Sequence, residues 1–290
     1  MAPSPNGDWT ANIDVSGEYG ITYIAAGCQP VTHGPYYIES NLWTPSQIVT
    51  ALWLDASDSD SVFLDEYGNV ESWIDRSGNA RDFTQDVVSS RPALEASVPA
   101  GRPKIFFDTF KYLERSNGWN SGNSHSIIAV VEPPSTGDRK YLISAGVTES
   151  GDAANSPLML FALRNNNQKV GYFDGSAWRG SASATSGLQI IGFVLDGTNG
   201  SAETYRDGAN LESGLPYAGN DFDPTRRVIL GARVGASNDW SGAKIGEIIK
   251  IDGVVEAGVR QKIEGYLAHK WGLADNLPSN HPYKNSAPNK

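Results

Sequence analysis

The chain has 290 residues, of which 39 % are hydrophobic and 19 % are charged, and these values are typical of a globular protein with a sizeable core. Thirty-three acidic residues against 23 Lys and Arg give a net charge of −10, which argues against binding to nucleic acid or to an anionic membrane surface. The single cysteine, Cys28, excludes an intrachain disulfide framework.

Residues 1–45 differ from the rest of the chain. Aromatic residues alternate with polar ones around Trp9, Tyr19 and Tyr23, and Tyr36 and Tyr37 follow a second turn. This pattern predicts a short β arm, and such an arm cannot bury a core of its own. We expect these five aromatic residues either to add strands to the main sandwich or to attach the chain to a larger assembly.

The main domain is expected over residues 46–290, as a series of short strands separated by turns. Residues 126–132 form a continuous apolar run, which predicts a strand buried on both faces. Asp207-Gly208 lies between two strand-like runs and predicts a type I′ hairpin turn. The other expected strands cover residues 52–55, 70–75, 104–108, 141–145, 158–164, 169–173, 177–179, 188–195, 202–206, 209–212, 226–232 and 243–252.

One helical pattern follows the strands, over about residues 256–272. Val259, Ile263 and Leu267 recur at a spacing of four and form an apolar stripe. Since no helices lie between the strands, the sheets should be antiparallel. The sequence therefore predicts an all-β, two-sheet jelly-roll sandwich, with this helix packed on it and with Trp53, Trp73 and Trp271 in the core.

Several stretches carry a family resemblance, among them residues 52–58, 73–79, 190–197 and 260–273. Together they resemble laminin G-like domains of the concanavalin A-like lectin and glucanase type, over about residues 46–284. The C-terminal part resembles a tail often attached to such domains in bacterial and phage proteins. The resemblance implies a two-sheet jelly roll and leaves the function open, because this fold carries lectins, glycosidases and virion parts.

Oxygen-bearing side chains in two loops suggest a calcium site. Asp55, Asp58, Asp75 and Asn79 supply the carboxylate and amide oxygens that hard cations prefer. The stretch from Asp75 to Asn79 also resembles a loop that contributes to calcium sites in some laminin G-like domains. The alternative is an Asx-type turn, in which Asp75 accepts hydrogen bonds from backbone amides.

Tryptophans in predicted loops suggest a sugar site. Trp119, Trp178 and Trp240, with Asn238, could provide stacking surfaces and polar contacts for a carbohydrate. The alternative for each tryptophan is a packing role at the rim of the sandwich.

Catalytic patterns are absent. Glucanases of this fold carry a Glu-x-Asp-x-x-Glu strand motif, which this chain lacks, and Glu247 and Asp252 should point to opposite faces of one strand. No zinc spacing and no nucleophile elbow occur. We therefore expect no catalytic residues, no required cofactor and no enzymatic activity.

Three function classes compete: a bacteriophage virion structural protein, a bacterial surface or secreted lectin, and a polysaccharide-degrading glycosidase. The N-terminus has no signal-peptide pattern, and no run of about 18 apolar residues could span a membrane. These features favour a non-enzymatic virion protein, as a capsid decoration, head fibre or tail component that is made in the host cytoplasm. Its expected partners are other virion proteins through the arm, host or environmental glycans, and further copies of itself.

Overall fold

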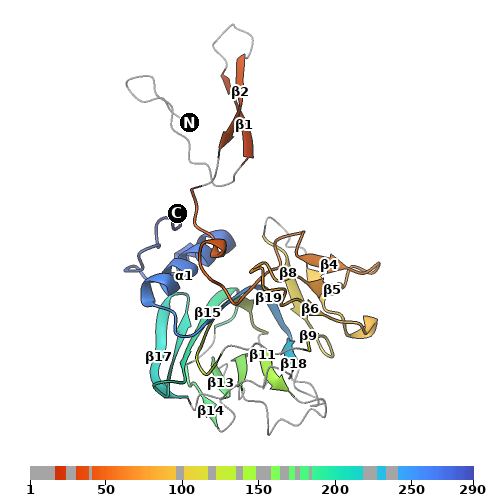
Figure 1. Ribbon diagram of the computed structural model, residues 1–290, viewed down its shortest axis with the longest axis vertical. Helices are drawn as coiled ribbons and strands as arrows, with labels where there is room; N and C mark the ends of the chain where they lie inside the picture. Colours follow the sequence, from red (N-terminus) through yellow and green to blue (C-terminus); the bar gives the residue numbers. More distant parts are fainter. Residues whose placement is uncertain are drawn as a thin grey trace.

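The computed structural model describes residues 17–23, 31–38, 41–95, 101–116, 122–134, 140–147, 158–163, 170–173, 177–182, 185–217, 227–232 and 241–290. Within these ranges the chain forms two large antiparallel sheets, a separate hairpin and a helix near the C-terminus (Figure 1). The predicted all-β sandwich with one C-terminal helix is therefore confirmed.

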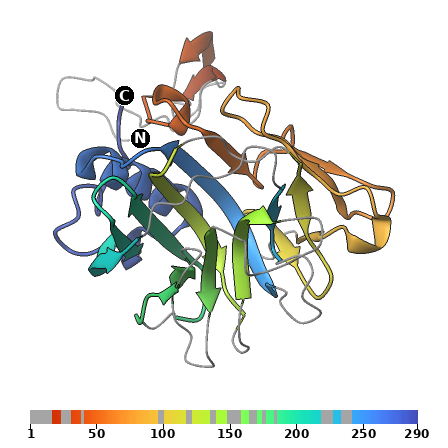
Figure 2. The same ribbon diagram turned by 60° about the horizontal axis from the view of Figure 1, so that its bottom comes forward.

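The first sheet has eight described strands, with the long β19 (Ala243–Asp252) near its centre. β19 pairs along its length with β10 (His125–Glu132), and Figure 2 shows the two strands side by side. On its other edge β19 pairs with both β3 (Leu52–Asp55) and β8 (Lys104–Phe107). The remaining strands are β7 (Ala93–Glu95), β15 (Gln189–Asp196), β16 (Ser201–Arg206) and β17 (Ala209–Pro216).

The second sheet has nine described strands. Their spatial order is β14 (Trp178–Arg179), β13 (Gly171–Phe173), β12 (Leu158–Leu163), β11 (Lys140–Val147), β18 (Arg227–Leu230), β9 (Leu113–Arg115), β6 (Phe83–Thr84), β5 (Val70–Trp73) and β4 (Val62–Leu64). Short 3₁₀ turns occur at η1 (Pro45–Gln47), η2 (Val88–Ser90) and η4 (Ala274–Asn276).

The strands that the sequence did not predict are β4, β6, β7 and β9, each of two or three residues. A segment this short cannot display an alternating pattern, so only its partner strands identify it. The predicted hairpin turn is confirmed, because Asp207 and Gly208 have φ angles of 47° and 79°.

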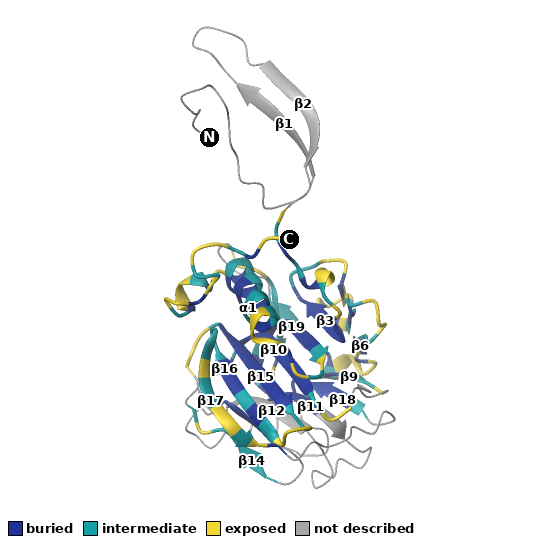
Figure 3. Ribbon diagram, turned by 60° about the vertical axis from the view of Figure 1, so that its left-hand side comes forward, coloured by how far each residue is buried: buried dark blue, intermediate teal, exposed yellow. Residues whose placement is uncertain are grey.

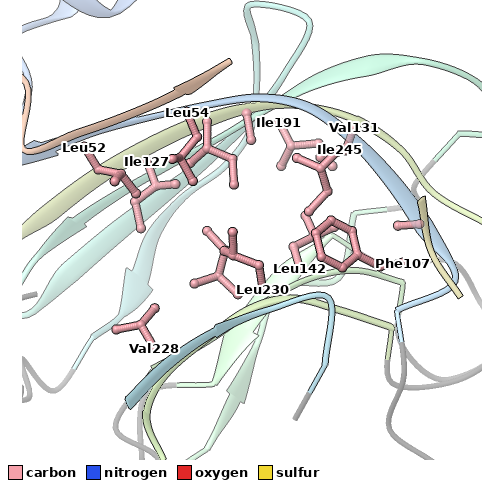
Figure 4. Close-up of a cluster of buried hydrophobic side chains, with 14 of the residues drawn as sticks. Leu52, Leu54, Phe107, Ile127, Val131, Leu142, Ile191, Val228, Leu230 and Ile245 are labelled. Carbon is pink, nitrogen blue, oxygen red and sulfur yellow. The ribbon is translucent and has the colours of Figure 1, made fainter. Parts of the chain in front are cut away.

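The main core lies between the two sheets. Figure 4 shows side chains of both sheets meeting there, including Leu54 and Ile245 from one sheet and Leu142 and Leu230 from the other. These four residues are almost fully buried. Removal of this apolar surface from water is the main favourable term for a sandwich of this kind.

β10 is buried on both faces, as the continuous apolar run predicted. Ile127, Ala129 and Val131 belong to the core between the sheets, whereas Ile128 and Val130 belong to a second cluster on the opposite face. The second cluster is covered by the helix. A strand between two apolar layers has no face for polar residues, and this explains its composition.

Helix α1 (Ala257–Trp271) covers the outer face of the eight-stranded sheet (Figure 3). Ile263 and Leu267 of the predicted stripe are fully buried in the second cluster, and Val259 packs against it. The helix ends at Gly272, whose φ of 70° is the left-handed conformation that favours glycine. In the described part of the chain no helix is long and apolar enough to cross a membrane.

The N-terminal hairpin consists of β1 (Gly17–Tyr23) and β2 (Val31–Ile38), which among the described strands pair only with each other. The pairing places Tyr19 opposite Tyr36, and Figure 1 shows the hairpin apart from the sandwich. In the described part of the chain this hairpin therefore extends neither sheet of the sandwich, and its role in attachment stays a prediction. The sandwich itself begins before the expected boundary at residue 46, because Trp43 is buried in the cluster under the helix.

A glycine sets the distance between helix and sheet. Gly246 lies at a bulge of β19 opposite Val130 and Val131, and the ring of Trp271 packs directly on it. A Cβ at this position would lie 2.6 Å from the Trp271 ring. The close approach therefore requires glycine here.

We expect Gly246→Ala to destabilise the domain by about 1–3 kcal/mol, because the added methyl group overpacks this contact. Denaturant unfolding measures the change. Gly258→Ala is the matched control, since a Cβ at Gly258 would meet nothing within 4 Å and alanine favours the helix by up to about 1 kcal/mol. Equal midpoints for Gly246→Ala and the parent chain would contradict this packing account.

Candidate functional site

The aspartates of the predicted calcium loops accept hydrogen bonds from their own turns. Oδ1 of Asp75 accepts from the backbone N–H groups of Ser77 (2.9 Å) and Trp53 (3.0 Å), and its Oδ2 accepts from the Ser77 hydroxyl and the Arg81 N–H. Asp58 pairs with Arg76. The Asx-turn interpretation of Asp75 is therefore what the structure shows.

The other two predicted ligands are also engaged. Oδ1 of Asp55 accepts hydrogen bonds from the backbone N–H and the hydroxyl group of Ser57. Its Oδ2 forms an ion pair with the Lys270 ammonium, which supplies the positive charge beside this carboxylate. The amide nitrogen of Asn79 donates to the Thr50 carbonyl at 2.9 Å. No group of three or more ligating side chains that could hold a metal ion occurs among the described residues. Calcium binding here stays a prediction of the sequence.

A buried carboxylate joins these loops to the helix. Glu247 on β19 has no solvent exposure. Its Oε1 accepts hydrogen bonds from the Trp53 indole (2.8 Å) and the Tyr266 hydroxyl (3.0 Å). Its Oε2 accepts from the Lys270 ammonium (2.6 Å) and the Trp271 indole (2.8 Å). We call these residues, together with Asp55, the Glu247 cluster.

Burial raises the pKa of Glu247, while the neighbouring Lys270 ammonium acts in the opposite direction. Burial also raises the pKa of the Tyr266 hydroxyl, which therefore stays protonated and donates to Glu247. All four donors to Glu247 are protein groups, and three of them come from α1. The cluster is thus a structural connection between helix and sheet. Its two carboxyl groups are almost fully buried, with side-chain exposures of 0 % for Glu247 and 8 % for Asp55.

Two further ionisable groups lie buried at the end of β10 and β19, and the sequence did not point to them. Burial lowers the pKa of His125 to about 3, with the Lys250 charge adding to the effect. Burial lowers the pKa of Lys250 to about 8, although its ion pair with Asp252 opposes this. As predicted, Glu247 and Asp252 face opposite sides of β19. Glu247 contacts the helix, whereas Asp252 pairs with Lys250, and Lys250 and Asp252 both lie at the alternate positions of the strand.

Trp178 is the only predicted sugar-binding residue within the described ranges. Its ring centroid lies 4.6 Å from that of Phe173 and 6.2 Å from that of the buried Tyr141. The three rings form an aromatic group on the nine-stranded sheet, separate from the main core. Trp178 is half-buried, so it packs at the rim and keeps part of its surface exposed. Trp119, Asn238 and Trp240 lie outside the described residues, as does Trp9, and the side chains of Tyr19, Tyr23, Tyr36 and Tyr37 are not described.

A charged pocket of about 330 Å³ opens on the outer face of the nine-stranded sheet, the face that is turned away from the core. Thr84 on β6 lies opposite Glu114 on β9, and both alternate with the core residues Phe83 and Leu113. Arg227 on β18 donates to Glu114 at 2.8 Å. We define the charged pocket by its polar lining residues, which are Asp82, Thr84, Asp86, Glu114, Arg115, Ser116 and Arg227.

The charged pocket presents both hydrogen-bond donors and acceptors. Nε of Arg227 is buried and has no hydrogen-bond partner among the described groups. Burial lowers the pKa of Arg115, but a guanidinium keeps its proton at physiological pH. Ala80 at the edge of the pocket has a φ of 52°, a strained value for a residue with a Cβ. The sequence missed this pocket because its residues come from three separate segments, residues 80–86, residues 114–116 and Arg227.

No protein-family model matches the chain, and no curated protein matches it. Solved structures share its fold. An arabinofuranosidase complexed with arabinofuranosyl-alpha-1,2-xylobiose is 12 % identical with a TM-score of 0.50, over 68 % of this chain and 50 % of that chain. Domain 4 of AbnA, a GH43 extracellular arabinanase from Geobacillus stearothermophilus in complex with arabinotriose, is 15 % identical with a TM-score of 0.49, over 72 % and 95 %. A Trypanosoma rangeli sialidase in complex with sialic acid is 16 % identical with a TM-score of 0.47, over 71 % and 31 %.

These comparisons correct one expectation. The sequence predicted a protein without enzymatic activity, whereas solved structures that share this fold with a TM-score of 0.50 are arabinofuranosidases, one of them a GH54 enzyme. At identities this low the likeness shows the fold alone, and the chain spans only about half of the arabinofuranosidase. The exclusion of enzymatic activity is therefore withdrawn. Membership of the laminin G-like family stays a prediction.

We expect Glu247→Gln to destabilise the domain by about 2–4 kcal/mol, because the amide removes one of the two carboxylate partners of the largely buried Lys270 and places an NH₂ group against other donors. Chemical denaturation measures the effect. Glu66→Gln makes the same change at an exposed position and should stay within about 0.5 kcal/mol of the parent. If the two variants unfolded at the same denaturant concentration, the cluster would not stabilise the fold.

Proposed function

We propose that the chain binds carbohydrate on the outer face of the nine-stranded sheet. The observation that carries the proposal is the charged pocket, in which carboxylates stand beside guanidinium groups. Glu114 and Arg227 are directly paired there at 2.8 Å. A sugar hydroxyl both donates and accepts hydrogen bonds, so a lining that offers acceptors and donors together suits a ligand rich in hydroxyl groups.

The aromatic group formed by Tyr141, Phe173 and Trp178 supports the same proposal. It lies on the nine-stranded sheet as the charged pocket does, and Trp178 keeps part of its ring accessible. Aromatic rings with an exposed surface can pack against the apolar face of a sugar. A ligand longer than one sugar unit would be needed to use both features.

The fold that this chain shares with an arabinofuranosidase supports carbohydrate as the class of ligand. The arabinofuranosidase that shares the fold is complexed with a trisaccharide, arabinofuranosyl-alpha-1,2-xylobiose. Glycoside hydrolysis needs two carboxyl groups at the bound sugar, and the charged pocket contains Asp82, Asp86 and Glu114. Binding assays should therefore be accompanied by a measurement of released reducing sugar.

We expect the full chain to bind neutral oligosaccharides on a glycan array, and we expect Asp86→Asn and Thr84→Ala each to weaken this binding about tenfold through the loss of a hydrogen bond. Both side chains are exposed in the pocket, so the fold should be unaffected. Calorimetry with the best array ligand gives the affinities. Glu66→Gln, an exposed carboxylate outside the pocket, should bind as the parent does. Equal affinities for all four proteins would remove the charged pocket as the site.

The hairpin of β1 and β2 supports a second part of the proposal, attachment to a larger assembly. It pairs with no described strand of either sheet of the sandwich. A two-stranded hairpin alone is marginally stable in water, so it needs a partner surface. The assembly that we propose is a bacteriophage virion, and this rests on the resemblance of residues 46–284 to laminin G-like domains with a phage-type tail.

We expect the protein to be found by mass spectrometry in purified phage particles, and a chain without residues 1–40 to be absent from them while the rest of the domain still folds. Circular dichroism of the shortened chain is the folding control. Particles that lack the full-length chain would contradict the virion proposal and leave carbohydrate binding unaffected.

A further inference from the structure

A second pocket lies on the opposite side of the sandwich, where α1 begins beside β15 and β16. It has a volume of about 270 Å³. Asp196, Ser201, Glu203, Tyr205 and Arg260 supply its polar lining, and Val254 lies among the aliphatic residues of its wall. Because α1 covers only part of the eight-stranded sheet (Figure 3), the outer faces of β15 and β16 reach this pocket. We call it the helix pocket.

Two polar side chains of the helix pocket are held in fixed positions. Tyr205 and Arg260 are only 7 % and 8 % exposed. The guanidinium carbon of Arg260 lies 3.8 Å from the centroid of the Tyr205 ring, and Nη1 donates to Glu264 at 2.6 Å. The Tyr205 hydroxyl donates to Glu203. A site whose polar groups are already ordered loses little conformational entropy when a ligand binds.

The remaining lining sets the chemistry of the ligand. Glu203 supplies a carboxylate acceptor and Ser201 a hydroxyl group, and Asp196 adds a carboxylate that already accepts hydrogen bonds from Thr198 and Asn199 of its own turn. An anionic ligand would meet the two carboxylates, whereas a cationic ligand would meet the guanidinium of Arg260. A neutral ligand with hydroxyl groups can donate hydrogen bonds to the carboxylates and accept one from the Ser201 hydroxyl group at the same time. Val254, half-exposed, offers an apolar surface for its C–H groups.

We infer that the helix pocket is a second binding site for a neutral saccharide, of about one or two sugar units given its small volume. The inference rests on the proposed function for the class of ligand and adds a site on the opposite sheet. Two sites on opposite faces allow one molecule to bridge two glycan chains. Binding to a surface dense in glycan is then strengthened by multivalency, without any new contact.

Amide chemical shifts in an NMR titration distinguish the two sites. The probe is arabinofuranosyl-alpha-1,2-xylobiose, with trigalacturonate and putrescine as its anionic and cationic counterparts. We expect the neutral trisaccharide to shift the signals of residues 201–205 and 254–260, and the two charged probes to leave them unchanged. Shifts at residues 80–86 and 114–116 report the charged pocket separately.

Variants confirm the assignment. Ser201→Ala and Glu203→Gln should each weaken the trisaccharide response at the helix pocket about fivefold or more, with the response at the charged pocket unchanged. The spectrum of each variant away from the pocket checks its fold.

Trisaccharide shifts at the charged pocket alone would overturn the second site and keep the proposed function. Shifts at the helix pocket alone would keep the second site and contradict the first. Shifts from putrescine or trigalacturonate but not from the sugar would overturn the ligand class, and no shift at either pocket would overturn both proposals.

Discussion

A buried carboxylate with four hydrogen-bond donors connects the helix of this molecule to its eight-stranded sheet. An ionised Glu247 without partners would be very costly at zero exposure, so the surrounding donors must be in place for the sheet and helix to pack. The donors are Trp53 from β3 and three residues of α1. One side chain thus connects β19, β3 and the helix, and it directly follows Gly246, the bulge residue on which Trp271 packs.

This connection determines which surfaces remain for ligands. Helix α1 covers the middle of the eight-stranded sheet and leaves the helix pocket open at its first turn. The nine-stranded sheet carries the charged pocket and the aromatic group formed by Tyr141, Phe173 and Trp178. Both pockets combine carboxylates with guanidinium groups, two in the charged pocket and one in the helix pocket, and we relate both to hydroxyl-rich ligands. In the loops that the sequence suggested for calcium, Asp55 pairs with Lys270 and Asp75 orders its own turn, and calcium binding stays a prediction.

Local patterns in the sequence predicted the local features of the fold. The apolar run of β10, the hairpin turn at Asp207-Gly208 and the stripe of α1 all follow from periodicity or turn chemistry, which neighbouring residues determine. The Glu247 cluster and the charged pocket could not be predicted in this way. Trp53 and Glu247 are 194 positions apart in the sequence, and Arg227 and Glu114 are 113 apart. Such pairs form only when the whole sandwich is assembled, and a buried glutamate resembles a surface residue in the sequence.

The hydrogen exchange of the Trp53 and Trp271 indole N–H groups tests the role of Glu247 most directly. Both indoles donate to this one carboxylate at 2.8 Å, away from solvent. The account predicts that both exchange only when the domain unfolds, with the same free energy of opening as the most protected amides of β10 and β19. Exchange of either indole as fast as that of an exposed tryptophan, in a folded domain, would contradict it.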